Sequence, residues 1–259
     1  MTATKWIPEG FRTVTPYLVV KGAANLTEFL QRAFHAELKG QWKRDDGTIM
    51  HSQLRIGDSA LELADGGGAY PPSPGSLHIY VADVDATYRR AVEAGAVSLR
   101  APANQPYGDR DASIQDPSGN QWYIGTCLTP GKPIPDGLHT INPYFHVLNA
   151  SGFIAWLQQA FGAVELSRHA GPEGTVIHAQ VRIGDSVVEI SEAHGPWQPL
   201  PYHLHLYFPD VDAVYRRAMD AGSTSLEAPN DKPYGDRSAG LKDAWGNQWS
   251  LATRLKDMS

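Results

Sequence analysis

The sequence feature that most constrains the fold is a motif that occurs twice. Residues 106–110 read PYGDR and are followed by Asp116 and by the letters GNQW at 119–122. The same letters return at 233–237 and 246–249, each 127 residues after the first copy. The units of solenoid proteins are only about 20–50 residues long. A repeat of this length is therefore predicted to be a whole domain, and the chain a tandem duplication.

The repeat extends over almost the whole chain. It aligns without a gap from Ile7 to Thr126 and again from Ile134 to Thr253. With 259 residues, the chain is long enough for two domains that each bury a core. We predict a first domain at 1–128, a proline-rich linker with the start of the second repeat at 129–141, and a second domain at 142–259.

Composition narrows the classes of partner. Lys and Arg number 22 against 28 Asp and Glu, which gives a net charge of −6, and basic residues never cluster beyond a pair. This pattern argues against a nucleic acid or a membrane surface as partner. The single cysteine, Cys127, allows no intrachain disulfide, and no apolar run is long enough to span a bilayer. We expect a cytoplasmic protein whose partner is a small molecule.

Hydrophobic periodicity predicts the order strand, helix, three strands, and it does so twice in each repeat. In the first repeat we expect helices at 24–34 and from Asp83, as N-cap, to Gly95. The strands that we can place in that repeat are 17–20, 49–56, 60–63, 77–81, about 97–99, 112–115 and 121–126. The fold class is therefore α+β, with two βαβββ units in each domain.

Alternation along these strands separates an apolar face from a polar one. Leu54 and Ile56 share one face, whereas His51 and Gln53 point to the other. Glu62, His78 and Tyr80 also alternate onto the polar side. A solvated sheet face would show the same pattern. The density of His, Glu and Tyr favours a concave polar pocket that binds a small molecule.

Several phrases of the sequence resemble the vicinal-oxygen-chelate superfamily, which includes glyoxalase I, the bleomycin-resistance proteins and the extradiol dioxygenases. The phrases are Ile-Pro-x-Gly, Ile-Gly-Asp-Ser, Tyr-Gly-Asp-Arg and Asp-Pro-x-Gly-Asn-x-Trp, and they look most like the PhnB-like branch. The resemblance implies tandem glyoxalase-like domains, each with a curved, barrel-like mixed sheet and helices on its outer face. It also implies a pseudo-dimer within one chain, either monomeric or homodimeric in solution. One fold hosts many chemistries, so the resemblance does not by itself assign a function.

Metal enzymes of this superfamily place ligands at four inward strand positions. By resemblance these positions fall on Thr15, Glu62, His78 and Tyr123 in the first repeat, and on Asn142, Glu189, His205 and Ser250 in the second. Glu and His suit a divalent Zn, Ni or Fe ion, whereas Thr, Asn and Ser are poor ligands. Two good ligands hold a metal only weakly, so the most favoured expectation is that no cofactor is required.

The second repeat carries additional histidines that keep the metal alternative open. His146, His169 and His203 stand where the first repeat has Val19, Trp42 and Ser76. Together with Glu189 and His205, His146 is a candidate metal ligand, and Glu189 and His205 are candidate catalytic residues. The alternative interpretation is that these imidazoles bond to neighbours or line a polar pocket without metal.

Arg110 and Arg237, in the repeated PYGDR loop, have two interpretations. A guanidinium can bind a carboxylate or enolate ligand, or it can be held internally by Asp109 or Asp116. The turns that contain Asp116 and Asp243 are expected to have no chemical role, and Trp122 and Trp249 are expected in the core. The glycine-rich stretch 66–75 is interpreted as a flap over the pocket. Tyr70, Trp197 and Trp42 are then candidate aromatic walls.

The residues expected to bind the ligand share the polar strand faces and the adjoining loops. They are Tyr17, His51, Gln53, Glu62, His78, Tyr107, Arg110, Tyr123, Tyr144, His146, His178, Gln180, Trp197, His203, Tyr234 and Arg237. The first hypothesis is a protein of the bleomycin-resistance type that binds an aromatic or polar organic ligand without catalytic metal. The alternative is a divalent-metal-dependent glyoxalase-, lyase- or dioxygenase-like enzyme with its site mainly in the second domain. A metal-free lyase or isomerase that uses His and Glu is a third, weaker possibility.

Overall fold

The computed structural model of the chain describes residues 5–68 and 70–256. It divides into two compact units, one formed by Tyr17–Tyr144 and the other by Met1–Pro16 together with Phe145–Ser259. These units are offset from the repeats of the sequence. The start of the first repeat, up to Pro16, belongs to the unit that contains most of the second repeat. Residues 129–144 belong to the unit that contains most of the first repeat. The strands that open the two repeats therefore pass from one unit to the other.

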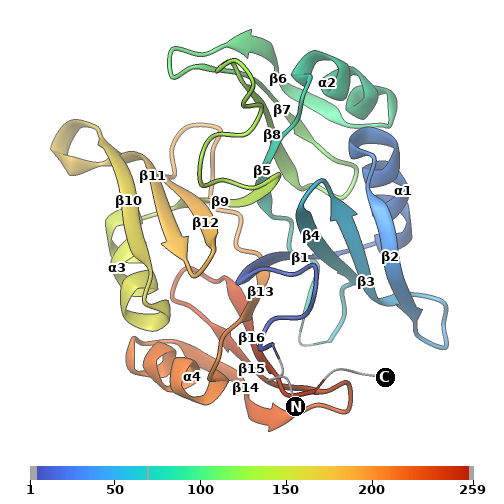
Figure 1. Cartoon of the computed structure of the whole chain (residues 1–259), viewed down its shortest axis with the longest axis vertical. Coiled ribbons are helices and arrows are strands. Elements are labelled where there is room, and N and C mark those ends of the chain that lie inside the picture. Colours follow the sequence, from blue (N-terminus) through green and yellow to red (C-terminus); the bar gives the residue numbers. More distant parts are fainter. Residues whose placement is uncertain (1–4, 69, 257–259) are drawn as a thin grey trace. The chain divides into compact units, whose positions relative to one another are not determined.

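The order strand, helix, three strands occurs four times, which confirms the prediction (Figure 1). The elements of the first repeat are β1 (Val14–Val20), α1 (Ala23–Phe34), β2 (Glu37–Lys43), β3 (Ile49–Ile56), β4 (Ser59–Asp65), β5 (Ser76–Tyr80), α2 (Val84–Glu93), β6 (Val97–Asn104), β7 (Asp109–Gln115) and β8 (Gln121–Cys127). Those of the second are β9 (Ile141–Val147), α3 (Ala150–Phe161), β10 (Val164–Ala170), the short helix η1 (Pro172–Gly174), β11 (Val176–Ile183), β12 (Ser186–Glu192), β13 (His203–Tyr207), α4 (Val211–Asp220), β14 (Thr224–Asp231), β15 (Asp236–Lys242) and β16 (Gln248–Arg254). The sequence predicted three strands after each helix but did not locate β2, because its seven residues are exposed or half-buried and lack an apolar alternation.

The strands form two eight-stranded mixed sheets, which agrees with the predicted α+β class. The orders are β14-β15-β16-β13-β1-β4-β3-β2 and β10-β11-β12-β9-β5-β8-β7-β6. β1 pairs with β4 in parallel, as do β5 with β8 and β13 with β16. Each sheet has an edge strand at either end, β14 and β2 in one and β10 and β6 in the other, so neither sheet closes into a barrel. The two βαβββ units of one repeat lie in different sheets.

The helices cover the apolar strand faces. The buried side of α1 includes Leu26, Phe29, Leu30 and Ala33, as the sequence predicted. Within one unit α1 packs against α2, and within the other α3 packs against α4 (Figure 1). Asp83 caps α2 by accepting a hydrogen bond from the Ala86 amide at 2.9 Å, which confirms the predicted N-cap.

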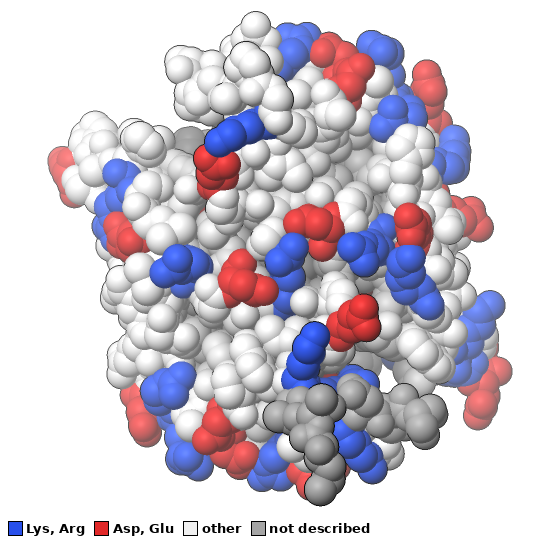
Figure 2. All heavy atoms as spheres, viewed as in Figure 1, with Lys and Arg blue, Asp and Glu red and all other residues white. Residues whose placement is uncertain are grey.

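None of the helices in the described part of the chain has the length and apolar character needed to cross a membrane. On the face drawn in Figure 2, Lys and Arg side chains lie interspersed with Asp and Glu. This mixture matches the near balance of charge in the sequence.

The turn before each last strand is held by a buried carboxylate. Asp243 accepts hydrogen bonds from the amides of Trp245 and Asn247, from the Asn247 side chain and from the Trp249 indole, all at 2.9 Å. Trp249 is only 1% exposed, which confirms its predicted place in the core. Burial raises the pKa of Asp243 although these four bonds oppose the shift. Asp116 holds the corresponding turn of the first repeat in the same way.

We predict that Asp243→Ala lowers the free energy of unfolding by roughly 2–4 kcal/mol, because it leaves buried donors of Asn247 and Trp249 without an acceptor. Urea denaturation followed by circular dichroism measures the change. The control is Asp45→Ala at an exposed position, for which we expect a change within about 0.5 kcal/mol. Equal effects of the two substitutions would contradict the role assigned to the turn.

Candidate functional site

Four of the predicted ligand-binding residues meet around His51. Strand β3 carries His51 and Gln53 on one face, and Glu62 on β4 pairs with both Gln53 and Tyr17 in strand register. The His51 Nδ1 atom lies 3.1 Å from the Tyr17 hydroxyl. Its Nε2 atom lies 3.3 Å from the Gln53 amide nitrogen and 3.5 Å from a Glu62 carboxylate oxygen. The predicted residues Tyr17, His51, Gln53 and Glu62 thus form one polar cluster.

Aromatic rings flank the same imidazole. The His51 ring stacks on Trp42 and on Tyr17, with centroid distances of 5.5 Å and 5.7 Å. The Glu62 side chain is 2% exposed, whereas Trp42 is 48% exposed. The cluster therefore extends from a buried carboxylate to a ring that solvent reaches. We refer to Tyr17, Trp42, His51, Gln53 and Glu62 as the His51 cluster.

The second repeat keeps the polar part of this cluster and loses an aromatic wall. The His178 Nε2 atom lies 3.4 Å from a Glu189 carboxylate oxygen, and Gln180 pairs with Glu189 across β11 and β12. His169, which replaces Trp42, pairs with His178 across β10 and β11. The two copies therefore share a His–Glu pair but differ in the ring beside it.

A second group of predicted residues lies on three neighbouring strands of the Tyr17–Tyr144 unit. His78 on β5 pairs with Asn142 on β9 and with Tyr123 on β8. The Tyr123 and Tyr144 rings are 5.0 Å apart, and the Tyr123 hydroxyl donates to the Gln121 side chain at 3.3 Å. Burial raises the pKa of Tyr123, so its phenol stays protonated at neutral pH.

The corresponding residues of the other unit lie on β13 and β16. His205 pairs with Ser250 in strand register, and its ring lies 4.6 Å from that of Tyr207. The His203 Nε2 atom is 2.7 Å from the Ser250 hydroxyl oxygen. Resemblance grouped His78 and Tyr123 with Thr15, and His205 and Ser250 with Asn142. The structure instead places β5 beside β9 and β13 beside β1, because each sheet takes strands from both repeats.

His146 on β9 is a buried, uncharged base. Its Nδ1 atom lies 2.7 Å from the Ser191 hydroxyl oxygen, and its ring stacks on Trp197 at a centroid distance of 5.8 Å. Burial lowers the pKa of His146 to about 4, with a smaller contribution from the nearby His194. The imidazole is therefore neutral at pH 7 and offers a hydrogen-bonding group without charge.

The two loop arginines are engaged by helix carboxylates. Arg110 donates two hydrogen bonds of 2.7 Å to Asp85, in the first turn of α2. Arg237 forms the same bidentate pair with Asp212 of α4. The sequence had suggested Asp109 or Asp116 as the internal partner, but Asp109 accepts a hydrogen bond from the Tyr80 hydroxyl. These ion pairs tie each helix to the neighbouring strand.

The loop tyrosines lie beside these arginines in the sequence. Tyr107 donates to Asp111 and is 66% exposed, and Tyr234 is 52% exposed. Partial burial raises the pKa of both phenols. Both hydroxyl groups are therefore protonated at neutral pH, and both side chains are exposed at the surface.

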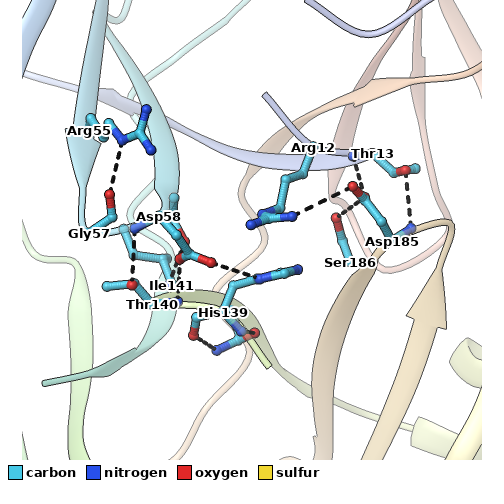
Figure 3. A network of polar contacts seen from close by, with 12 residues as sticks. Arg12, Thr13, Arg55, Gly57, Asp58, His139, Thr140, Ile141, Asp185 and Ser186 are labelled. Carbon is cyan, nitrogen blue, oxygen red and sulfur yellow. Dashed lines mark hydrogen bonds and ion pairs between the residues drawn. The ribbon is translucent and has the colours of Figure 1, made fainter. Parts of the chain in front are cut away.

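The repeated Ile-Gly-Asp-Ser phrase forms a polar network that the sequence did not reveal (Figure 3). Asp58 accepts a hydrogen bond from the Thr140 amide at 2.8 Å and lies 3.0 Å from the His139 Nδ1 atom. Its counterpart Asp185 accepts from the Thr13 amide at 2.8 Å and lies 3.8 Å from an Arg12 nitrogen. Burial would raise the pKa of each carboxyl group, but the hydrogen bonds outweigh it and lower the pKa. These carboxylates hold the starts of β9 and β1.

A cavity of about 320 Å³ lies within the unit that contains the second repeat. Its walls are residues 145–148 at the end of β9, residues 199–201 of the loop before β13, and Ala244, Trp245 and Asn247 of the turn before β16. Among the predicted ligand-binding residues, only His146 contributes to these walls. Sequence reasoning missed the cavity because it treated the turn at 243–247 as structural.

The sequence profile of the Glyoxalase/Bleomycin resistance protein/Dioxygenase superfamily matches residues 12–124 and 147–251. The chain belongs to this superfamily. An uncharacterized protein of Mycobacterium bovis is 36% identical over 123 residues, which are 43% of this chain and 81% of that protein. A second uncharacterized relative, from Mycobacterium tuberculosis, is also 36% identical over 123 residues, 43% of this chain and 72% of its own length.

Solved structures of the superfamily share the fold. Glyoxalase I from Zea mays has a TM-score of 0.71 at 17% sequence identity, covering 93% of this chain and 92% of its own. A candidate dioxygenase from Bacillus subtilis has a TM-score of 0.63 at 14% identity, with 94% and 85% covered. Identities this low establish the architecture alone. The narrower resemblance to the PhnB-like branch stays a prediction.

The described side chains do not fit the divalent metal that some members of this superfamily use. Over residues 5–68 and 70–256, no three His, Cys, Asp or Glu side chains are grouped so that they can hold a metal ion. The predicted ligands His146 and Glu189 lie on neighbouring strands, but His205 lies on β13 in the other sheet. Ser250 and Asn142, next to His205 and His78, are poor ligands for Zn, Ni or Fe. No catalytic step through a metal follows from this donor set.

We predict that His146 makes the stability of the protein depend on pH. Its pKa is about 6.5 in the unfolded chain and about 4 in the folded one, so the unfolded state gains the proton first as pH falls. Above pH 6.5, His146 does not reduce the free energy of unfolding. Between pH 6.5 and pH 4 the free energy of unfolding falls progressively, by up to about 3 kcal/mol. Urea denaturation at intervals from pH 7.5 to pH 4.5 measures the slope.

The matched variant is His146→Val, which introduces the residue of the first repeat, Val19. We expect it to flatten the dependence of unfolding free energy on pH. The exposed His169→Ala serves as control and retains the wild-type slope. An unchanged slope in His146→Val would show that other groups cause the dependence.

Proposed function

We propose that this chain binds a small organic ligand that carries an aromatic ring and hydrogen-bonding groups, and that it does so at the His51 cluster. The observation that carries the proposal is the position of His51, which stacks on two aromatic rings while its two nitrogens lie near Tyr17, Gln53 and Glu62. Ligand sites combine apolar walls with a few convergent polar groups, and this cluster has both.

The chemistry of the cluster favours a ligand with a planar ring. The exposed face of Trp42 gives a surface on which such a ring can stack. The Gln53 amide offers both donors and an acceptor, and the Tyr17 hydroxyl can do either. The buried Glu62 carboxylate makes the site unfavourable for an anion and compatible with a donor group. These side chains recognise the ligand directly, so binding requires no catalytic metal.

The first repeat is the better candidate because the second lacks the indole. His169 replaces Trp42, and an imidazole gives a smaller stacking surface. The remaining residues of the cluster recur as Tyr144, His178, Gln180 and Glu189. The duplication therefore provides a matched internal comparison at every position.

A screen of aromatic natural products by thermal shift, followed by isothermal titration calorimetry, tests the proposal. We predict that Trp42→Ala weakens binding of the selected ligand by at least about tenfold, because the stacking area is lost. The counterpart His169→Ala is the control and should retain the affinity of the parent protein. Equal affinities of Trp42→Ala and the parent protein would exclude the His51 cluster as the site.

The metal content of the purified protein separates binding from the metalloenzyme alternative. We predict that protein purified without a histidine tag contains far less than one equivalent of Zn, Ni or Fe by mass spectrometry, because two good ligands hold a metal weakly. Titration with each ion should reveal no tight site. About one equivalent of metal, lost in Glu189→Ala or in His205→Ala, would contradict this and favour the glyoxalase- or dioxygenase-like alternative.

A further inference from the structure

The cavity in the unit of the second repeat is a separate feature from the polar strand faces. It opens between the end of β9, the loop before β13 and the turn before β16. Its volume of about 320 Å³ is at the lower end of the range for small-molecule sites, roughly 300–1,000 Å³. Leu148, on its wall, is 63% exposed, so the cavity reaches solvent.

The corresponding loop of the first repeat makes a different contact with its strand. There the loop before β5 lies against β1 through a bridge between Val19 and Ser73, and the Ser73 amide donates to the Val19 carbonyl at 2.8 Å. Over the described residues of the second repeat, the corresponding pair, His146 and Leu200, forms no such bridge. Both repeats retain the neighbouring bridge, Gly67 with Tyr70 and His194 with Trp197. The two loops therefore differ locally, at the segment that walls the cavity.

Three of the wall residues differ between the repeats. The wall residues His146, Leu200 and Trp245 stand where the first repeat has Val19, Ser73 and Ser118. Trp245 is held in place by a hydrogen bond from its indole nitrogen to the Leu148 carbonyl at 2.7 Å. Its ring lies edge-on to Phe153 of α3 at a centroid distance of 5.0 Å. The second repeat thus has larger side chains at these positions and uses them as fixed walls.

The walls hold no carboxylate, ammonium or guanidinium group. None of the ten wall residues is Asp, Glu, Lys or Arg, and the single histidine, His146, lies with its Nδ1 atom 2.7 Å from the Ser191 hydroxyl oxygen. The carboxylate on the same turn, Asp243, is not among the walls and already accepts four hydrogen bonds. A charged group against these walls would lose part of its hydration and would find no oppositely charged residue among them.

From these observations we infer that the cavity bounded by Leu148, Leu200 and Trp245 is a second ligand site, specific for a small, uncharged aromatic molecule of one or two fused rings. The ring stacks against the Trp245 indole and the apolar loop. The corresponding loop of the first repeat is instead bonded to β1 through the Val19–Ser73 bridge. It does not depend on the His51 cluster, which lies in the other unit.

Isothermal titration calorimetry with 2-naphthol and its charged analogue 2-naphthoate tests the inference on the full chain. We expect 2-naphthol to bind with a dissociation constant below about 1 mM. We expect 2-naphthoate to bind at least about tenfold more weakly, since its carboxylate has no partner in the cavity. Saturable binding of both compounds with equal affinity, or of neither, would overturn the inference.

Variants that restore residues of the first repeat locate the binding. Trp245→Ser and Leu200→Ser should each weaken 2-naphthol binding, the first by about tenfold because the stacking surface is removed. Leu200→Ser keeps the test decisive if Trp245→Ser does not fold by circular dichroism. The control is Leu226→Ser, which changes an exposed leucine of β14 outside the cavity walls and should leave 2-naphthol binding unchanged. Loss of 2-naphthol binding in Trp42→Ser, with Trp245→Ser and Leu200→Ser unaffected, would assign the ligand to the His51 cluster instead.

Discussion

Two hydrogen-bonded turns set the position of the strands on which each candidate site is built. At one turn, Asp58 and Ser59 accept hydrogen bonds from the amides of Thr140 and Ile141, where β9 begins. At the other, Asp185 and Ser186 accept from Thr13 and Val14, where β1 begins. A slip of one residue along a strand turns every side chain to the opposite face. Because β1 carries Tyr17 and β9 carries His146, these four polar bonds fix the face on which both residues lie.

The fold was predictable from the sequence because its signals are local and written twice. The 127-residue repeat, the alternation in β3 and the Asp83 cap each depend on residues close together in the chain. The pairing of β5 with β9 and of β13 with β1 was not predictable, since it joins strands of different repeats that have equivalent patterns. For the same reason the sequence grouped His78 with Thr15 rather than with Asn142. Local patterns define each βαβββ unit but do not decide which unit it pairs with.

The candidate site shows the same division between local and distant information. His51, Gln53 and Glu62 could be predicted to share a face because β3 and β4 are neighbours in sequence and their polar residues alternate. The partner of Arg110 was missed because Asp85 lies on a helix 25 residues away, whereas Asp109 is adjacent. The cavity beside Trp245 was missed for another reason. A cavity forms where a loop does not pack against its neighbours, and the sequence of the loop does not predict this.

Duplication allows the two copies to differ while the framework stays the same. Both repeats keep the buried aspartates, Asp116 and Asp243, that hold the last turn, since losing either would leave buried donors unsatisfied. Other positions differ between the repeats: His169 replaces Trp42, and Trp245 replaces Ser118. None of these four side chains donates a hydrogen bond to Asp116 or Asp243. The first repeat places its indole against His51, whose Nε2 atom lies 3.5 Å from the buried Glu62 carboxylate, and the second places one among walls without Asp, Glu, Lys or Arg. An aromatic ring can stack on either indole, so we expect the charge around each indole to distinguish the ligands of the two proposed sites.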